Sequence, residues 1–168
     1  MRKLYGCSSF ALFSLFYGLH YVAAWLSREE TLGEVAVDIV GSATLLIELL
    51  WLYQLNVDLG RYCGYRSVNT ERTFLIVLVA MMLTNLLGFL TSGEPRTVGT
   101  DLWVYIALLL AASFWVSSHL AQKLVACERA RALVVSTQVR TTWAFFILPI
   151  GIWFLQPRIK RLFAATGA

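Results

Sequence analysis

Glu48 is the residue of this sequence whose type and position point most directly to chemistry. It stands near the middle of an apolar stretch, residues 38–56, which reads DIVGSATLLIELLWLYQLN. A membrane-spanning helix needs about 20 mostly apolar residues, and a carboxylate at its centre costs roughly 2.5–3.5 kcal/mol on insertion scales. A partner must therefore hold Glu48 there. A proton- or cation-binding role would explain why a carboxylate occupies this position.

Polar residues at helical spacing accompany Glu48. Thr44 and Glu48 fall within a ~60° arc of a helical wheel, and Asp38 lies ~80° beyond Glu48. Thr84 and Asn85 form a similar stripe in the next apolar stretch. If the two helices are antiparallel neighbours, the depths of Glu48 and Asn85 differ by only ~6 Å at about 1.5 Å per residue. We therefore expect Asn85 and Thr84 to be hydrogen-bond partners of the Glu48 carboxyl.

Glu48 can be interpreted in two ways. In the first, the carboxylate binds a proton or cation in a polar pathway. In the second, a protonated Glu48 hydrogen-bonds Asn85 or a neighbouring subunit and only holds helices together. No Lys or Arg lies at the same depth, which favours a neutral, protonated Glu48. His119 lies about 7 Å from Glu48 in depth and is a candidate relay group, whereas His20 is expected in the opposite leaflet.

The sequence contains no pattern typical of catalysis or of a bound cofactor. It has no GxSxG, HExxH or P-loop motif, and no paired carboxylates. The cysteines, Cys7, Cys63 and Cys127, are far apart and form no CxxC pair. We therefore interpret them as free thiols near inner helix ends. The two histidines are too far apart to share a metal or a haem. We expect no enzyme activity, cofactor or metal site.

The composition shows what must position these residues. The chain has 168 residues, of which 58% are apolar and 14% charged, with a mean hydropathy of +0.67. Soluble domains are about 45–50% apolar and about 25% charged. The apolar runs are continuous, whereas a membrane β-barrel shows alternation in segments of about 10 residues. The sequence thus predicts an all-α, polytopic integral membrane protein forming a single domain over residues 1–168.

Four spans are expected, followed by a C-terminal region of different character. The spans are residues 4–26, 35–57, 73–92 and 102–122. The C-terminal region comprises an amphipathic helix at 123–140, an apolar segment at 141–156 and a basic tail at 157–168.

Positive charge is distributed unequally between the two expected faces. The N-terminal side carries nine basic residues and the other side two, so the positive-inside rule places the N-terminus in the cytoplasm of an inner or plasma membrane. The nine are Arg2, Lys3, Arg61, Arg66, Arg72, Lys123, Arg129, Arg131 and Arg140, and the two are Arg28 and Arg96.

The apolar segment 141–156 is short for a membrane span. At about 1.5 Å per residue its 16 residues reach only ~24 Å, less than the ~30 Å apolar core of a bilayer. We favour a bent re-entrant hairpin or interfacial helix around Pro149, Ile150 and Gly151, with the C-terminus inside. A fifth crossing is the alternative.

The basic residues of the inner side form a second candidate site. We expect them to contact anionic lipids, at about 1 kcal/mol each, or a cytoplasmic partner protein, and Glu128 is available to pair with Arg131 at i+3. Nucleic acid is not an expected partner. These residues are Arg61, Arg66, Arg72, Lys123, Arg129, Arg131, Arg140, Arg158, Lys160 and Arg161.

Two functional hypotheses result. In the first, a homo-oligomer forms or gates a path for protons, ions or small solutes, lined by Glu48 and Asn85. In the second, the chain is a membrane anchor or sensor that recruits a cytoplasmic protein through its basic inner face, and Glu48 is only structural.

Overall fold

The computed structural model describes residues 8–28, 34–64, 68–90, 100–133 and 136–164, and all regular structure in these ranges is helical. The side chains of some helical residues, including Asp38 and Asn85, lie outside the description. The elements are α1 (Ser9–Phe13), the π-helix η2 (Ser14–Gly18), α2 (Leu19–Arg28), α3 (Glu34–Tyr62), α4 (Val68–Leu90), α5 (Thr100–Ala130), α6 (Gln138–Phe146) and α7 (Leu148–Ala164).

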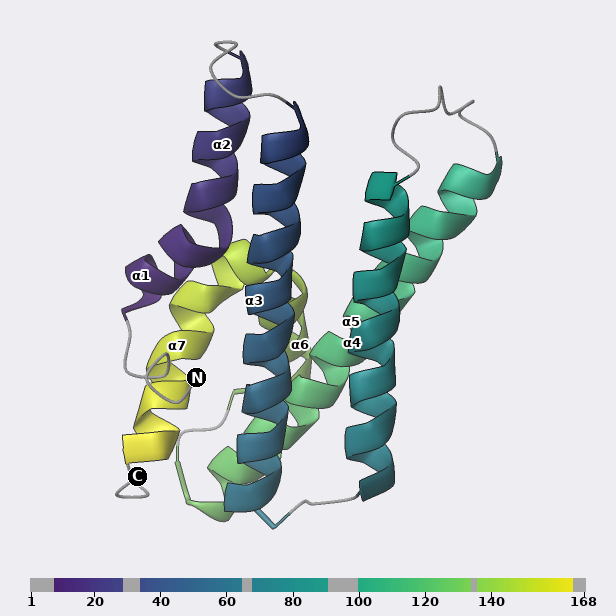
Figure 1. The fold of residues 1–168 in the computed structure, drawn as a ribbon. Coiled ribbons are helices and arrows are strands. Elements are labelled where there is room, and N and C mark those ends of the chain that lie inside the picture. Colours follow the sequence, from purple (N-terminus) through teal and green to yellow (C-terminus); the bar gives the residue numbers. More distant parts are fainter. Residues whose placement is uncertain (1–7, 29–33, 65–67, 91–99, 134–135, 165–168) are drawn as a thin grey trace.

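The helices form an elongated bundle (Figure 1). Helices α2 and α3 lie side by side, and α4 runs antiparallel to α3. Helix α5 crosses behind them and ends at the lower end of the view, where α3 ends and α4 begins. Helix α7 ends there as well, so four helix termini meet at this end. We call it the basic end, because Arg61, Arg129 and Arg161 lie in the last turns of α3, α5 and α7.

Two helices are long and apolar enough to cross a membrane in the part of the chain that the structure describes. They are Ile39–Tyr62 within α3 and Ile106–Ala130 within α5. The other two expected spans are helical too, but neither meets this test over the residues whose side chains the structure describes, which in α4 are only residues 70–84. In the first, α1, η2 and α2 follow one another without a gap over residues 9–28, and the π-helical turn of η2 interrupts the regular α-helix. The all-helical prediction is thus confirmed, and the four-span prediction is not.

The structure differs from the separate amphipathic helix expected over residues 123–140. Helix α5 continues to Ala130, because Leu124 and Cys127 face the core and are fully buried. The chain then turns through Ala132, whose φ of 51° is incompatible with continuing the helix. Helix α6 begins only at Gln138. Thr137 caps its N-terminus, because the Thr137 side chain accepts a hydrogen bond from the Arg140 backbone N–H.

The apolar segment 141–156 is bent, and its bend lies at Ile147, two residues before the expected Pro149. Ile147 has φ −101° and ψ 58°, which ends α6. Pro149 then falls in the first turn of α7, where its missing N–H leaves no helical hydrogen bond unmade. Gly151 packs directly against the backbone of Ala144, and a Cβ at this position would clash with the Ala144 carbonyl. The α6–α7 hairpin therefore depends on a glycine.

The apolar core joins helices that are distant in sequence. Residues of α3 and α5 pack with one whole face of α7 and with Leu12 of α1. The C-terminal helix is thus part of the core and does not lie loosely on the surface. The fully buried members include Leu12, Leu55, Leu59, Leu120, Leu124, Ile152, Leu155, Ile159 and Leu162.

Candidate functional site

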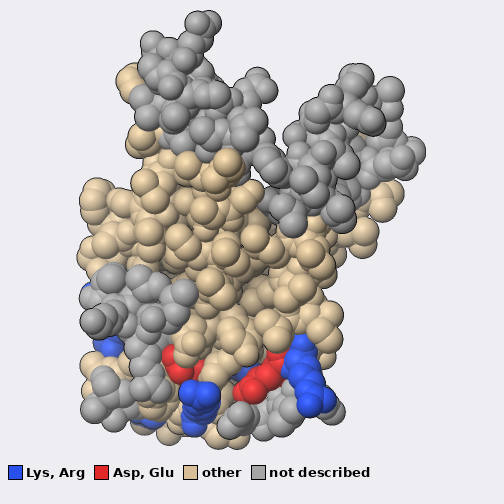
Figure 2. Space-filling view, in the orientation of Figure 1, with Lys and Arg blue, Asp and Glu red and all other residues tan. Residues whose placement is uncertain are grey.

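Among the residues that Figure 2 colours by type, the charged side chains lie towards the lower end of the view. Lys, Arg, Asp and Glu gather at the lower end, where α3 ends and α4 begins, and a wide band above them shows none. Glu48 is the exception within the fully described part of α3, since it lies near the middle of that helix. The surface pattern thus separates an apolar band from the basic end.

The partner of Glu48 is a tyrosine of the N-terminal helical segment. The Tyr17 hydroxyl donates to Glu48 Oε1 at 3.5 Å, from η2 to α3. This is longer than the 2.5–3.0 Å of an ordinary O–H···O bond, so the contact is weak. Both side chains are half-buried. A π-helix is rare and is frequently found at functional sites, which makes this contact the first candidate site.

The structure gives the other expected members of the Glu48 network different surroundings. Thr44 is buried, and its hydroxyl donates to the Gly41 carbonyl at 2.8 Å. The Thr84 hydroxyl donates to the Ala80 carbonyl at 2.6 Å. The side chains of Asp38 and Asn85 lie outside the described residues, so the Glu48–Asn85 pair stays a prediction.

Tyr17 could have been found from the sequence. The depth comparison that selected Asn85 also applies to the first expected span, where Tyr17 lies within ~6 Å of the depth of Glu48 at about 1.5 Å per residue. Its hydroxyl is the donor that a carboxylate in an apolar band requires.

His119 lies in an aromatic environment. Its ring stacks on Trp115 with a centroid distance of 5.5 Å and an interplanar angle of 7°. Phe74 of α4 lies at the same centroid distance from the imidazole ring. The Nε2 atom of His119 is buried and has no hydrogen-bond partner in the described part of the chain. The imidazole is thus held by ring contacts, and one of its polar atoms is left available for water.

Lys123 is buried, which differs from the exposed position expected for lipid or partner contact. Its Nζ donates to Asn56 Oδ1 at 2.8 Å, joining α5 to α3. Asn56 is fully buried and Lys123 is only 7% exposed. Asn56 Nδ2 and the Nε1 of nearby Trp51 on α3 are buried without a hydrogen-bond partner among the described residues. These N–H groups are candidate water sites, since buried polar groups rarely stay unpaired.

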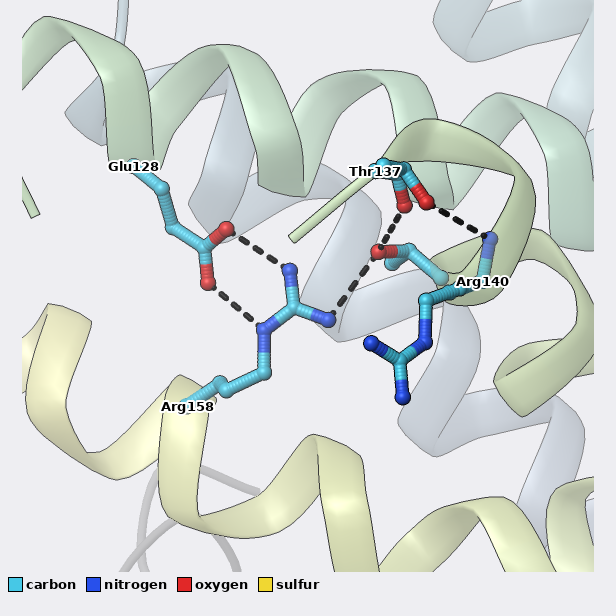
Figure 3. Close-up of polar contacts among 5 residues, drawn as sticks. Glu128, Thr137, Arg140 and Arg158 are labelled. Carbon is cyan, nitrogen blue, oxygen red and sulfur yellow. Dashed lines mark hydrogen bonds and ion pairs between the residues drawn. The ribbon is translucent and has the colours of Figure 1, made fainter. Parts of the chain in front are cut away.

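Arg158 is also engaged inside the molecule, as Figure 3 shows. Its Nε and Nη2 donate to the two carboxylate oxygens of Glu128 at 2.8 and 2.7 Å. Its Nη1 donates to the Thr141 hydroxyl at 3.0 Å. The bidentate pair joins α5 to α7, and Thr141 adds α6. Glu128 therefore pairs with Arg158, 30 residues away, where the sequence suggested Arg131.

The other basic residues differ in exposure, and their contact with a lipid or a partner stays a prediction. Arg66 lies outside the described residues. Arg131 and Lys160 are half-buried. The exposed members are Arg61, Arg72, Arg129, Arg140 and Arg161.

Two of the cysteines are joined, so their interpretation as free thiols is wrong for this pair. Cys63 follows the last residue of α3, and Cys127 lies in the last turn of α5. A disulfide connects them, with Cα atoms 5.3 Å apart, which is within the usual range. Cys7 lies outside the described residues. The signal was present in the sequence, because both residues are expected at inner ends of spans.

No family model, curated protein or solved structure matches this chain. Within the described residues, no group of three or more His, Cys, Asp or Glu side chains is arranged to hold a metal ion. Any function must therefore be inferred from the arrangement of the chain's own polar residues.

Proposed function

We propose that this chain is a membrane protein that carries protons across the bilayer by way of Glu48, on a route that opens at its basic end. Membrane placement is supported by the two span-length apolar helices and by the band of Figure 2 in which the coloured surface shows no Lys, Arg, Asp or Glu. In that placement, Glu48 stands in the apolar band and the arginines face the membrane–water boundary. The observation that carries the proposal is a carboxylate in this band whose described hydrogen-bond partner is one weakly bound tyrosine.

Polar atoms between Glu48 and the basic end support a route for the proton. The N–H groups of Trp51 and Asn56 and the Nε2 of His119 are buried and unpartnered in the described part. Lys123 contacts Asn56 directly. Asn56 lies eight residues after Glu48 on α3, or ~12 Å at about 1.5 Å per residue. Water bound to these groups would shorten the steps that a proton must make.

A proton fits this site better than a metal cation does. A hard cation such as Ca²⁺ needs about six or more oxygen ligands, and Mg²⁺ needs near-ideal octahedral geometry. A proton needs only the carboxylate itself. Asn85 and Asp38 are expected on the outer side of Glu48, away from the basic end, and belong to the proposed lining. A second copy of the chain would complete this lining.

The anchor hypothesis has less support. Two of the ten basic residues expected to face a lipid or partner, Lys123 and Arg158, are bound within the molecule. The remaining basic surface is what any membrane protein presents on its cytoplasmic side.

Proton flux into proteoliposomes tests the proposal. A potassium gradient with valinomycin drives the flux, and an entrapped pH-sensitive dye reports it. We expect Glu48→Gln to reduce the flux at least about tenfold, because the amide keeps the shape and hydrogen bonding but cannot bind the proton. Glu48→Asp is the matched control, since it retains the titratable group and should retain flux. Equal flux in the wild type and in Glu48→Gln would refute the proposed role of Glu48.

A further inference from the structure

A pocket with a volume of about 640 Å³ lies along the α6–α7 hairpin. Its walls combine two kinds of side chain. One kind is aromatic or aliphatic and the other is basic. The walls include Arg140, Arg158, Arg161, Trp143, Ile150 and Phe154.

The two kinds of side chain are separated along the pocket by the way the chain folds. The chain reverses at Ile147, where α6 ends and α7 begins. Ile147 and Ile150 line the pocket near this turn. Arg140 precedes the turn by seven residues and Arg161 follows it by fourteen, so the arginines lie away from it. The pocket is therefore apolar at one end and cationic at the other.

The cationic end carries unbalanced positive charge. Arg158 is neutralised by its bidentate pair with Glu128, and no Asp or Glu is among the described residues that line the pocket. Arg140 and Arg161 are exposed. In Figure 3 the guanidinium of Arg140 is joined to none of the residues drawn. Two arginines can thus bind an anion, and guanidinium groups match phosphate oxygens in a bidentate geometry.

We propose that this pocket is a binding site for an anionic phospholipid. The phosphate lies against Arg140 and Arg161, and an acyl chain lies against Trp143, Ile150 and Phe154. The occupant must be apolar and anionic at opposite ends, which describes a lipid better than a soluble phosphate. The site assumes the membrane placement of the proposed function and is independent of the role of Glu48.

Native mass spectrometry of the detergent-solubilised full chain tests the site, with phosphatidylglycerol as the probe and phosphatidylcholine as the neutral comparison. We expect phosphatidylglycerol to stay bound preferentially. The double variant Arg140→Gln/Arg161→Gln should lower its affinity about 30-fold, and each single variant about fivefold. The matched control is Arg61→Gln/Arg72→Gln, which removes two exposed arginines that do not line the pocket and should change the affinity less than about threefold.

Three further results separate the proposal from its alternatives. Equal loss in both double variants would overturn the site, since it would indicate general attraction to the basic end. Displacement of the lipid by equimolar glycerol phosphate would overturn it in favour of a soluble phosphate, whereas Ile150→Asn should weaken lipid binding alone. A dimeric mass without bound lipid would mean that a second copy fills the pocket. The Glu48→Gln variant should bind lipid as the wild type does. A failure of the lipid site is therefore distinguishable from a failure of the proton pathway.

Discussion

Glu128 and Glu48 are two carboxylates taken out of bulk water in opposite ways. Glu128 accepts two short hydrogen bonds from one guanidinium, at 2.7 and 2.8 Å. Glu48 accepts one contact at 3.5 Å from a neutral hydroxyl. Two charge-assisted hydrogen bonds from one guanidinium hold a carboxylate in one position. A carboxylate with only a distant hydroxyl is stabilised chiefly by taking up a proton.

This difference gives Glu128 a structural role and makes Glu48 the carboxylate suited to binding and releasing a proton. The charge on Glu128 is balanced by Arg158, which in turn is held by Thr141. Within the described residues Glu48 has this one polar contact, so its charge can change there without breaking a network. Three substitutions test this comparison.

Replacing Arg158 by Met should give the largest loss of stability. The change leaves Glu128 buried without its counter-charge, and breaking a buried pair costs about 3–5 kcal/mol. The free energy of unfolding in mixed micelles, followed by tryptophan fluorescence, measures the effect. The double variant Glu128→Gln/Arg158→Met removes both charges and should recover most of the loss. If Arg158→Met and the double variant were equally unstable, the pair would not be the stabilising feature.

Replacing Gly151 by Ala should have an intermediate effect on the same assembly. The added Cβ would clash with the Ala144 carbonyl and force α6 away from α7, which carry Thr141 and Arg158. Overpacking of this kind costs about 1–3 kcal/mol. Gly18→Ala is a matched control in η2, where the nearest atom to the added Cβ would be 3.6 Å away. The same unfolding assay compares the two, and similar losses in both would show that the hairpin tolerates separation.

Replacing Tyr17 by Phe should have the smallest effect. A typical hydrogen bond contributes about 0.5–1.5 kcal/mol, and the long contact to Glu48 should contribute about 0.5 kcal/mol or less. A double-mutant cycle of Tyr17→Phe with Glu48→Gln isolates this coupling. A coupling free energy above about 1.5 kcal/mol would mean that Tyr17 fixes Glu48 as firmly as Arg158 fixes Glu128, and the comparison would fail.

The helices were predictable because each results from a local property of the chain. Apolar runs of span length and the polar segments between them place α3, α4 and α5 close to the expected ranges. The end of α5 was not predictable in this way. Leu124 and Cys127 continue its buried face past residue 122, and that burial depends on α3 and α7.

The polar pairs were harder to predict because each joins distant parts of the chain. Lys123 and Asn56 are 67 residues apart, and Arg158 and Glu128 are 30 apart. The positive-inside rule counts a lysine or arginine as a surface charge, and it contains no information about a buried partner. The bend at Ile147 was also misplaced from the sequence. Pro149 suggested a bend at its own position, whereas it lies in the first turn of α7 and the chain turns two residues earlier.

The short distance between Cys63 and Cys127 limits the ways in which the chain can cross a bilayer. Two residues whose Cα atoms are 5.3 Å apart must lie on the same side of it. The chain between them therefore crosses an even number of times. If α5 makes one crossing, the segment before it must make another, and α4 is the helix described there. Any insertion in which α5 crosses and α4 does not would place these cysteines on opposite sides.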